Sequence, residues 1–241
     1  MKGVILAGGL GTRLMPLTRI TNKHLLPVYD KPMIYYPLLT LIDGGLDEIM
    51  IVTGGSFAGD FLQLLGNGRE FGLNDIHYTY QEGEGGIADA LSLAEHFVDR
   101  DRVIVMLGDN IIEKSIKEYV DNYRAQEKGA KILLKEVHDP NRFGVPDIQG
   151  DRIVAIEEKP KMPKSSFAVT GIYMYDDMVW DVIKTLTPSA RNELEITDVN
   201  NAYINNSILT YDILDGWWTD AGTFDSLHMA SIRVAERDRK K

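Results

Sequence analysis

Residues 2–13 have the sequence KGVILAGGLGTR, in which a short apolar run leads into a glycine-rich loop. An uninterrupted apolar run of this length is typical of a strand that is buried on both faces of a parallel sheet. Similar runs follow at 48–52 (EIMIV) and 103–107 (VIVML), and segments with helical periodicity lie between them. This alternation of strand and helix predicts an α/β fold built on a doubly wound, mostly parallel sheet.

The second half of the chain has a different pattern, with strands and few helices, which indicates a mixed-sheet part after residue 129. Its one linker-like stretch, 160–166 (PKMPKSS), is too short to separate independent domains. We therefore expect one domain over 1–241, with a first half at 1–128, a second half at 129–222 and a closing helix at 223–241. The predicted strands are 2–7, 48–52, 76–81, 103–107, 130–137, 142–148, 152–158 and 168–175, and the other predicted helices are 32–43, 57–65, 87–97 and 114–128.

Composition excludes several classes of function. The 241-residue chain has a formal net charge of −10 and contains no cysteine. An acidic chain without a stripe of Lys and Arg repels a phosphate backbone, so we expect no nucleic-acid partner. The lack of cysteine excludes disulfides and thiolate chemistry, which leaves oxygen and imidazole ligands for a metal. No apolar stretch approaches the roughly 20 residues that span a bilayer, so we expect a cytoplasmic protein without a membrane partner.

The glycine-rich loop at 8–13 could be a tight turn or a phosphate site. It is not a Rossmann fingerprint, because Leu14 stands where the third glycine would fall, and the spacing does not fit a Walker A loop either. Two cations, Arg13 and Lys23, favour the phosphate site, because phosphoryl-type transfer depends on positioning and charge neutralisation.

Two aspartates are candidate metal ligands. Asp109 follows the most apolar strand of the first half, and ligands bind at the carboxyl ends of strands in open α/β sheets. Asp220 lies in the distant segment 217–223 (WWTDAGT). Each could instead be a helix N-cap, but together they could hold a hard cation such as Mg²⁺. The sequence alone does not bring them together.

Other polar segments have simpler interpretations. The simplest interpretation of the segment 157–160 (EEKP) is a solvated strand end. For 191–198 (RNELEITD) it is a loop that enters a helix. The histidines show no metal-ligand spacing, and we assign no catalytic role to His24, His77, His96, His138 or His228.

Taken together and in this order, these segments resemble the glucose-1-phosphate thymidylyltransferases of the sugar nucleotidyltransferase family over nearly the whole chain. The matching motifs are LAGGxGTR at 6–13, LLPVYDKPMIYYPL at 25–38, LGDN at 107–110, EEKP at 157–160, AVTG at 168–171 and ELEITD at 193–198. The resemblance implies a Rossmann-like nucleotidyltransferase fold, with a nucleotide-binding half at 1–128 and a sugar-phosphate-binding half at 129–222.

The resemblance also assigns roles to residues. It implies that the enzyme transfers a thymidylyl group from dTTP to α-D-glucose 1-phosphate, with Mg²⁺ as cofactor, and that it forms a homo-oligomer. Arg13, Lys23 and Lys159 would be the catalytic residues, and Asp109 and Asp220 would bind the metal. The nucleotide would be bound by Gly8, Gly9, Gly11, Thr12, Arg13, Gln81, Gly86 and Asp109. The sugar phosphate would be bound by Asn110, Gly144, Glu158, Lys159, Val169 and Tyr173.

The chain departs from the family in three places. The segment 81–89 (QEGEGGIAD) lacks the proline after Gln81 and the glutamine near Asp89 that family members carry. His24 replaces a glutamine beside the lysine. Longer relatives continue beyond the position of Lys241 into a segment linked to regulation, so we expect feedback control to be missing or altered.

Three other functions remain open. A UTP-dependent glucose-1-phosphate uridylyltransferase shares the loop and the chemistry. A catalytically silent nucleotide-sugar-sensing subunit could keep the fold, although it would not need the whole charged set. A nicotinamide dehydrogenase is disfavoured by the missing third glycine.

Overall fold

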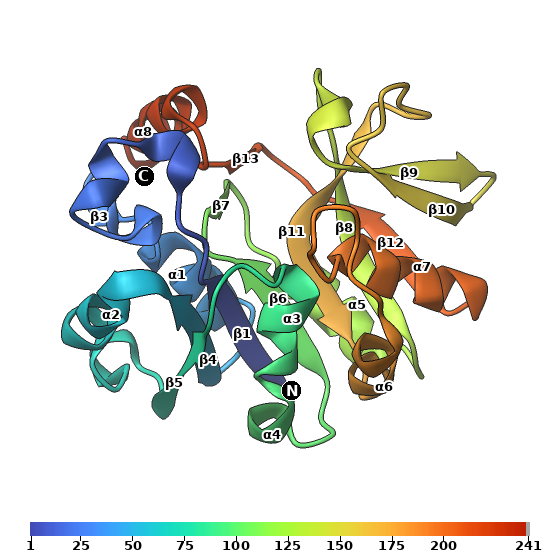
Figure 1. Cartoon of the computed structure of the whole chain (residues 1–241), viewed down its shortest axis with the longest axis horizontal. Coiled ribbons are helices and arrows are strands. Elements are labelled where there is room, and N and C mark those ends of the chain that lie inside the picture. Colours follow the sequence, from blue (N-terminus) through green and yellow to red (C-terminus); the bar gives the residue numbers. More distant parts are fainter. Residues whose placement is uncertain (240–241) are drawn as a thin grey trace.

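A twisted sheet of seven strands forms the centre of the part that the computed structural model describes, residues 1–239 (Figure 1). The order of its strands is β12-β8-β11-β6-β1-β4-β5, and all are parallel except β11, which runs antiparallel to β6 and β8. The mostly parallel α/β sheet predicted from the sequence is therefore confirmed. The strands are β1 (Lys2–Ala7), β4 (Glu48–Gly54), β5 (Asp75–Gln81), β6 (Val103–Leu107), β8 (Ala130–Glu136), β11 (Phe167–Tyr175) and β12 (Leu209–Ile213).

Helices cover both faces of this sheet, because successive apolar residues of each strand point to opposite sides. Val4 and Leu6 belong to one buried cluster, and Ile5 and Ala7 belong to another. The first cluster packs against α3 (Ile87–Ser92), α4 (Glu95–Val98), α6 (Met178–Thr185) and α7 (Ile196–Asn205). The second packs against α1 (Tyr35–Asp43), α2 (Ala58–Leu65) and α5 (Lys117–Ala125). Two helical layers around one sheet make the fold doubly wound.

Smaller elements surround the sheet and are listed here with their bounds. Three two-stranded pairs are β2 (Pro27–Val28) with β3 (Lys31–Pro32), β7 (Asn110–Ile112) with β13 (Trp218–Asp220), and β9 (Gly144–Gln149) with β10 (Arg152–Glu158). The 3-10 helices are η1 (Thr12–Leu14), η2 (Leu17–Arg19), η3 (Lys23–Leu25), η4 (Gly55–Phe57), η5 (Arg69–Phe71) and η6 (Pro140–Arg142). The closing helix is α8 (Phe224–Asp238), and residues 240–241 of the helix predicted at 223–241 lie outside the described residues.

The structure differs from the predicted elements in a few places. The helix predicted at 87–97 is divided into α3 and α4, and the hydroxyl of Ser92 donates to the carbonyl of Asp89 at the end of α3. Such a side-chain bond competes with the helical hydrogen bonds. The second half contributes β8, β11 and β12 to the same central sheet, so the mixed pairing arises from one reversed strand. No helix within 1–239 is both long and apolar enough to cross a membrane.

The order of the strands fixes the position of the candidate site. From β1 the chain moves to β4 and then β5 on one side, and it returns to place β6 on the other side of β1. Strands that lead away in opposite directions leave a crevice between their carboxyl ends, which is where ligands bind in doubly wound folds. The glycine-rich loop after β1 and Asp109 after β6 lie at this crevice.

Candidate active site

A cleft with a volume of about 840 Å³ opens at the carboxyl ends of β1 and β6. Its size is within the range of ligand sites, roughly 300–1,000 Å³. Both halves of the chain contribute to it, because the loop after β1 faces the segments around β9, β10, β11 and α7. Every residue that the sequence assigned to the site lines this cleft, namely Gly8, Gly9, Gly11, Thr12, Arg13, Lys23, Gln81, Gly86, Asp109, Asn110, Gly144, Glu158, Lys159, Val169, Tyr173 and Asp220.

The glycine-rich loop packs closely against the lysine that the sequence grouped with it. Gly11 has a φ of 66°, in the left-handed region that favours glycine. A Cβ atom at Gly11 would lie 2.8 Å from Cβ of Lys23 and 2.9 Å from a methyl group of Thr18. A Cβ at Gly8 would lie 2.7 Å from Oε1 of Gln81. A larger residue at either position would therefore displace the side chains that line the cleft.

Lys23 and Asp109 form a buried ion pair. Nζ of Lys23 donates to Oδ2 of Asp109 at 2.6 Å, and the two side chains are 14% and 10% exposed. Burial alone would raise the pKa of the Asp109 carboxyl. Lys23, His24 and the hydrogen bonds from Lys23 and Asn110 lower it more, so the net pKa lies below its usual range. Asp109 is thus a carboxylate at neutral pH.

His24, which follows Lys23 in the sequence, is buried. Its backbone N–H donates to Oδ1 of Asn22 at 2.9 Å, and its Nδ1 lies 2.8 Å from the same oxygen. An amide oxygen only accepts, so Nδ1 carries the proton of a neutral ring. Burial, followed by the positive charge of Lys23, lowers the pKa of His24 from 6.5 to about 3. The sequence assigned His24 no catalytic role, because the histidines lack metal-ligand spacing, and it did not predict that this ring is buried.

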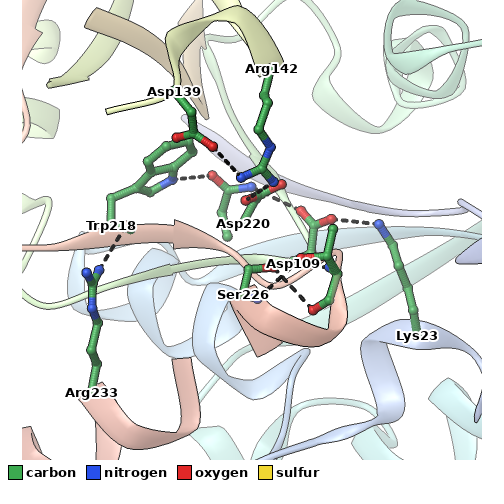
Figure 2. Close-up of polar contacts among 10 residues, drawn as sticks. Lys23, Asp109, Asp139, Arg142, Trp218, Asp220, Ser226 and Arg233 are labelled. Carbon is green, nitrogen blue, oxygen red and sulfur yellow. Dashed lines mark hydrogen bonds and ion pairs between the residues drawn. The ribbon is translucent and has the colours of Figure 1, made fainter. Parts of the chain in front are cut away.

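Asp220 lies beside Asp109 because β13 pairs with β7. In this pairing Asp220 is opposite Asn110, and the N–H of Ala221 donates to the carbonyl of Asp109 at 2.8 Å. Figure 2 shows the two carboxylates together, with Lys23 next to Asp109 and Arg142 next to Asp220. Burial and the charge of Asp109 raise the pKa of Asp220 from 3.8 to about 6, against the opposing effect of Arg142 and Arg13.

This pair of carboxylates suits a hard divalent cation. Neighbouring carboxylates repel each other, and a cation between them relieves the repulsion. Residues 1–239 contain no cluster of three or more His, Cys, Asp or Glu side chains that could hold a metal. A cation held by Asp109 and Asp220 would need water or substrate oxygens as its other ligands, which is the habit of Mg²⁺.

The side-chain amide of Asn110 holds the carboxylate of Asp109 in place. Its Oδ1 accepts from Nε1 of Trp218 at 2.6 Å and from the N–H of Gly171 at 2.9 Å, and its Nδ2 donates to Oδ1 of Asp109 at 3.1 Å. Asn110 lines the cleft as predicted, but these partners occupy most of its hydrogen-bonding capacity.

At the opposite wall, Glu158 organises a group of charged and polar side chains. Its Oε2 accepts from the hydroxyl of Thr197 at 2.8 Å. Nζ of Lys159 and the guanidinium of Arg191 lie 3.4 and 3.6 Å from its Oε1. Lys159 and Arg191 therefore place two positive charges at one wall of the cleft.

The sequence missed three residues of this site. Arg142, Arg191 and Thr197 line the cleft, although the sequence placed Arg191 and Thr197 in a simple loop that enters a helix. Arg191 and Thr197 both belong to the RNELEITD segment, but only the fold shows that this segment turns toward Glu158.

Gln81 lies at the end of β5, where its amide group is oriented by two acceptors. Its Nε2 donates to Oδ2 of Asp89 at 2.7 Å and to the carbonyl of Gly86 at 3.1 Å. Its Oε1 is the atom near Gly8, so the acceptor end of the amide faces the glycine-rich loop.

A model of the nucleotidyl transferase family matches residues 2–237, and the chain belongs to this family. Curated relatives are named glucose-1-phosphate thymidylyltransferase. The one from Neisseria meningitidis is 46% identical over 97% of this chain and 82% of its own length, and the one from Mycolicibacterium smegmatis is 43% identical over 98% and 83%.

Solved structures agree with this assignment. One is a crystal structure from Bacillus anthracis, provisionally named a glucose-1-phosphate thymidylyltransferase and solved in complex with a sucrose. It is 55% identical to this chain, with a TM-score of 0.93. The match covers 97% of this chain and 94% of that chain. A UDP-glucose pyrophosphorylase complexed with UDP-glucose has 22% identity and a TM-score of 0.85 over 98% of both chains, which shows a shared fold.

Proposed function

We propose that this protein is a glucose-1-phosphate thymidylyltransferase that joins dTTP to α-D-glucose 1-phosphate and releases dTDP-glucose and pyrophosphate. Its family and the names of its curated relatives support this reaction. The observation that carries the proposal is the charge arrangement of the cleft. Lys23 and the Asp109–Asp220 pair lie beside the glycine-rich loop, and Lys159 and Arg191 lie at the opposite wall. Two polyanions could meet between these groups.

The two halves of the chain would bind different substrates. In this proposal residues 1–128 bind the nucleotide, residues 129–222 bind the sugar phosphate, and α8 (Phe224–Asp238) closes the domain. Residues 8–13 would enclose the triphosphate with backbone N–H groups, with Thr12 at its end. Gly144, Glu158, Val169 and Tyr173 would line the sugar.

The chain's main task is to overcome repulsion between two anions. An oxygen of the sugar phosphate attacks the α-phosphorus of the triphosphate in line, and the bond from that phosphorus to the bridging oxygen of pyrophosphate breaks. The attacking oxygen is already ionised at neutral pH, so no general base is needed. Arg13 and Lys23 would neutralise the triphosphate and the leaving pyrophosphate, and Lys159 would hold the sugar phosphate. In a partly dehydrated cleft each of these contacts is stronger than in water.

Asp109 and Asp220 would hold the divalent cation, and we propose Mg²⁺. When bound, it supplies positive charge to the phosphate oxygens. The low pKa of Asp109 keeps that carboxylate ready to bind a cation at neutral pH. Asp220 titrates near pH 6 in the metal-free protein, so binding of the cation would release the proton that it carries at acidic pH.

The orientation of Gln81 favours a thymine or uracil base over cytosine. Asp89 and the carbonyl of Gly86 accept from its Nε2, which leaves Oε1 as the free end of the amide. An acceptor at this place suits the N3–H of thymine or uracil, whereas cytosine presents a lone pair at N3. The backbone of Gly86 would read a neighbouring base atom.

A homo-oligomeric state and a cytoplasmic location complete the proposal. The oligomeric state follows from the family resemblance, and the cytoplasmic location fits a protein whose proposed substrate is a nucleoside triphosphate. Light scattering of the purified full chain would test the oligomeric state.

The test is pyrophosphate release by the purified protein with Mg²⁺ and glucose 1-phosphate, with dTTP, UTP, CTP, ATP and GTP offered in parallel. We expect the highest kcat/KM with dTTP and no release from an Asp109→Asn variant. A preference for UTP would keep the mechanism but make the protein a uridylyltransferase. Binding of nucleotides without release from any of them would indicate the sensing subunit instead.

A further inference from the structure

Asn200 is a buried polar residue of α7 whose hydrogen bonds within the protein are incomplete. It is 1% exposed, and it lines the cleft together with its neighbours Ile196 and Thr197. Its Oδ1 accepts from the hydroxyl of Tyr175 at 2.6 Å. No residue within 1–239 accepts a hydrogen bond from its Nδ2. Buried amide groups normally find partners, so this donor needs an explanation.

Tyr175 fixes which way the amide of Asn200 points. Burial raises the pKa of Tyr175 far above its usual value, so its hydroxyl keeps its proton and must donate it. Among the described residues the acceptor is Oδ1 of Asn200. If the amide were reversed, Nδ2 would face the phenol and the phenolic proton would lose its acceptor. The donor end of Asn200 is therefore turned away from Tyr175, and Asn200 lines the cleft whereas Tyr175 does not.

The surroundings of Asn200 belong to the sugar end of the cleft. The rings of Tyr173 and Tyr175 are stacked, with centroids 6.1 Å apart and planes 8° apart, and the hydroxyl of Tyr175 reaches Asn200 of α7. Tyr173 lines the cleft, and no residue of 1–239 accepts from its hydroxyl. Thr197 lies three residues before Asn200, on the same face of the helix, and holds Glu158. Asn200 thus adds a donor to the wall formed by Tyr173, Thr197 and Glu158.

We propose that Asn200 is a specificity-determining residue that donates a hydrogen bond from Nδ2 to a hydroxyl oxygen of the hexose ring, with Tyr175 as its positioning residue. This inference rests on the proposed function, because it names a contact in the sugar subsite of that reaction. A sugar hydroxyl accepts through its oxygen lone pairs, and the proposed function places the sugar beside Tyr173 and Glu158, which line the same cleft as Asn200.

The experiment compares glucose 1-phosphate with its 2-, 3-, 4- and 6-deoxy analogues in wild type and in Asn200→Leu, a variant of similar shape without a donor. We expect wild type to lose roughly 10- to 100-fold in kcat/KM with one of the analogues because of this contact. Asn200→Leu should lose a similar factor with glucose 1-phosphate itself and show no further loss with that analogue. The inference is overturned if the variant discriminates against every analogue as wild type does.

Two tyrosine variants separate this role from a general effect on packing. Tyr175→Phe removes the hydroxyl that orients Asn200 and should weaken discrimination at the same sugar position only. Tyr203→Phe is the matched control, because its ring lies 5.5 Å from that of Tyr175 but its hydroxyl donates to Asp176 at 2.7 Å. It should leave the sugar profile unchanged. Equal profiles for Tyr175→Phe and wild type would contradict the positioning role even if Asn200→Leu did not fold.

Failure of this inference can be distinguished from failure of the proposed function. If wild type releases no pyrophosphate with glucose 1-phosphate and any nucleotide, the proposed function fails, and the inference fails with it. If wild type turns over glucose 1-phosphate but Asn200→Leu keeps the full sugar profile, only the inference fails.

Discussion

Replacement of His24 by glutamine should make the stability of the metal-free protein less sensitive to acid. Burial lowers the pKa of His24 from 6.5 to about 3 in the folded state. As the pH falls below 6.5, the imidazole of the unfolded chain takes up a proton and the folded one does not. Protonation therefore stabilises the unfolded state, and the free energy of unfolding decreases from about pH 6.5 downward.

The size of the effect follows from the interval between the unfolded pKa and the experimental pH. Between pH 7.5 and pH 5.0 the buried histidine should cost about 2 kcal/mol of stability, which is 1.5 pH units at about 1.36 kcal/mol per unit. Glutamine does not titrate, so His24→Gln should lack this part of the loss. For a chain of this length the difference corresponds to a shift of roughly 4–8 °C in Tm.

Urea unfolding of both proteins at pH 7.5 and pH 5.0, without metal or nucleotide, measures the difference directly. His96→Gln is the control, because His96 is exposed whereas His24 is buried. It should follow wild type at both pH values. If His24→Gln loses as much stability as wild type between the two pH values, the buried neutral state of His24 is refuted.

Three further predictions concern the site and its scaffold. Asp89→Leu removes one of the two acceptors that orient Gln81. The ratio of kcat/KM for dTTP to that for CTP should therefore fall about tenfold. An unchanged ratio would show that Asp89 does not select the base. Lys159→Ala should raise the KM for glucose 1-phosphate about tenfold or more, with Tm unchanged because the side chain is half exposed, and a normal KM in steady-state kinetics would remove Lys159 from the sugar-phosphate site. Gly86→Ala places a Cβ 2.6 Å from the carbonyl of Leu194 at a φ of 97°, and it should cost about 1–3 kcal/mol in urea unfolding. Gly59→Ala meets nothing within 4 Å and should add up to about 1 kcal/mol, so equal stabilities for these two variants would contradict the assignment of strain to Gly86.

The sequence predicted those parts of the site that follow directly from a strong local pattern. Asp109 was found because it follows the most apolar strand of the first half, and β1 with its loop was found in the same way. Long apolar runs are recognisable because a buried parallel strand leaves few positions for polar residues.

The remainder depends on pairings between distant segments that leave no local pattern. Asp220 is placed by β13, a strand of three residues whose only partner within 1–239 is the equally short β7. Arg191 lies in a loop that enters α7, as predicted, but the sequence does not show that Glu158 and Glu195 hold this side chain at the cleft. The proposed role of Asn200 depends on Tyr175 of β11, whose hydroxyl donates to Oδ1 and leaves Nδ2 for a ligand. The sequence gives no sign of this contact.

The pairing of β7 with β13 also has a consequence for the synthesis of the chain. Asp109 belongs to the first half of the chain, but its neighbour Asp220 belongs to β13, the last strand before α8. A chain that is still growing on the ribosome, or one cut before β13, contains the loop, Lys23 and Asp109 without the second carboxylate. Contacts between residues so far apart in sequence form late in folding. Cation-dependent turnover should therefore appear only after the chain has been made and folded through β13, so chains that end before β13 would not consume nucleoside triphosphate.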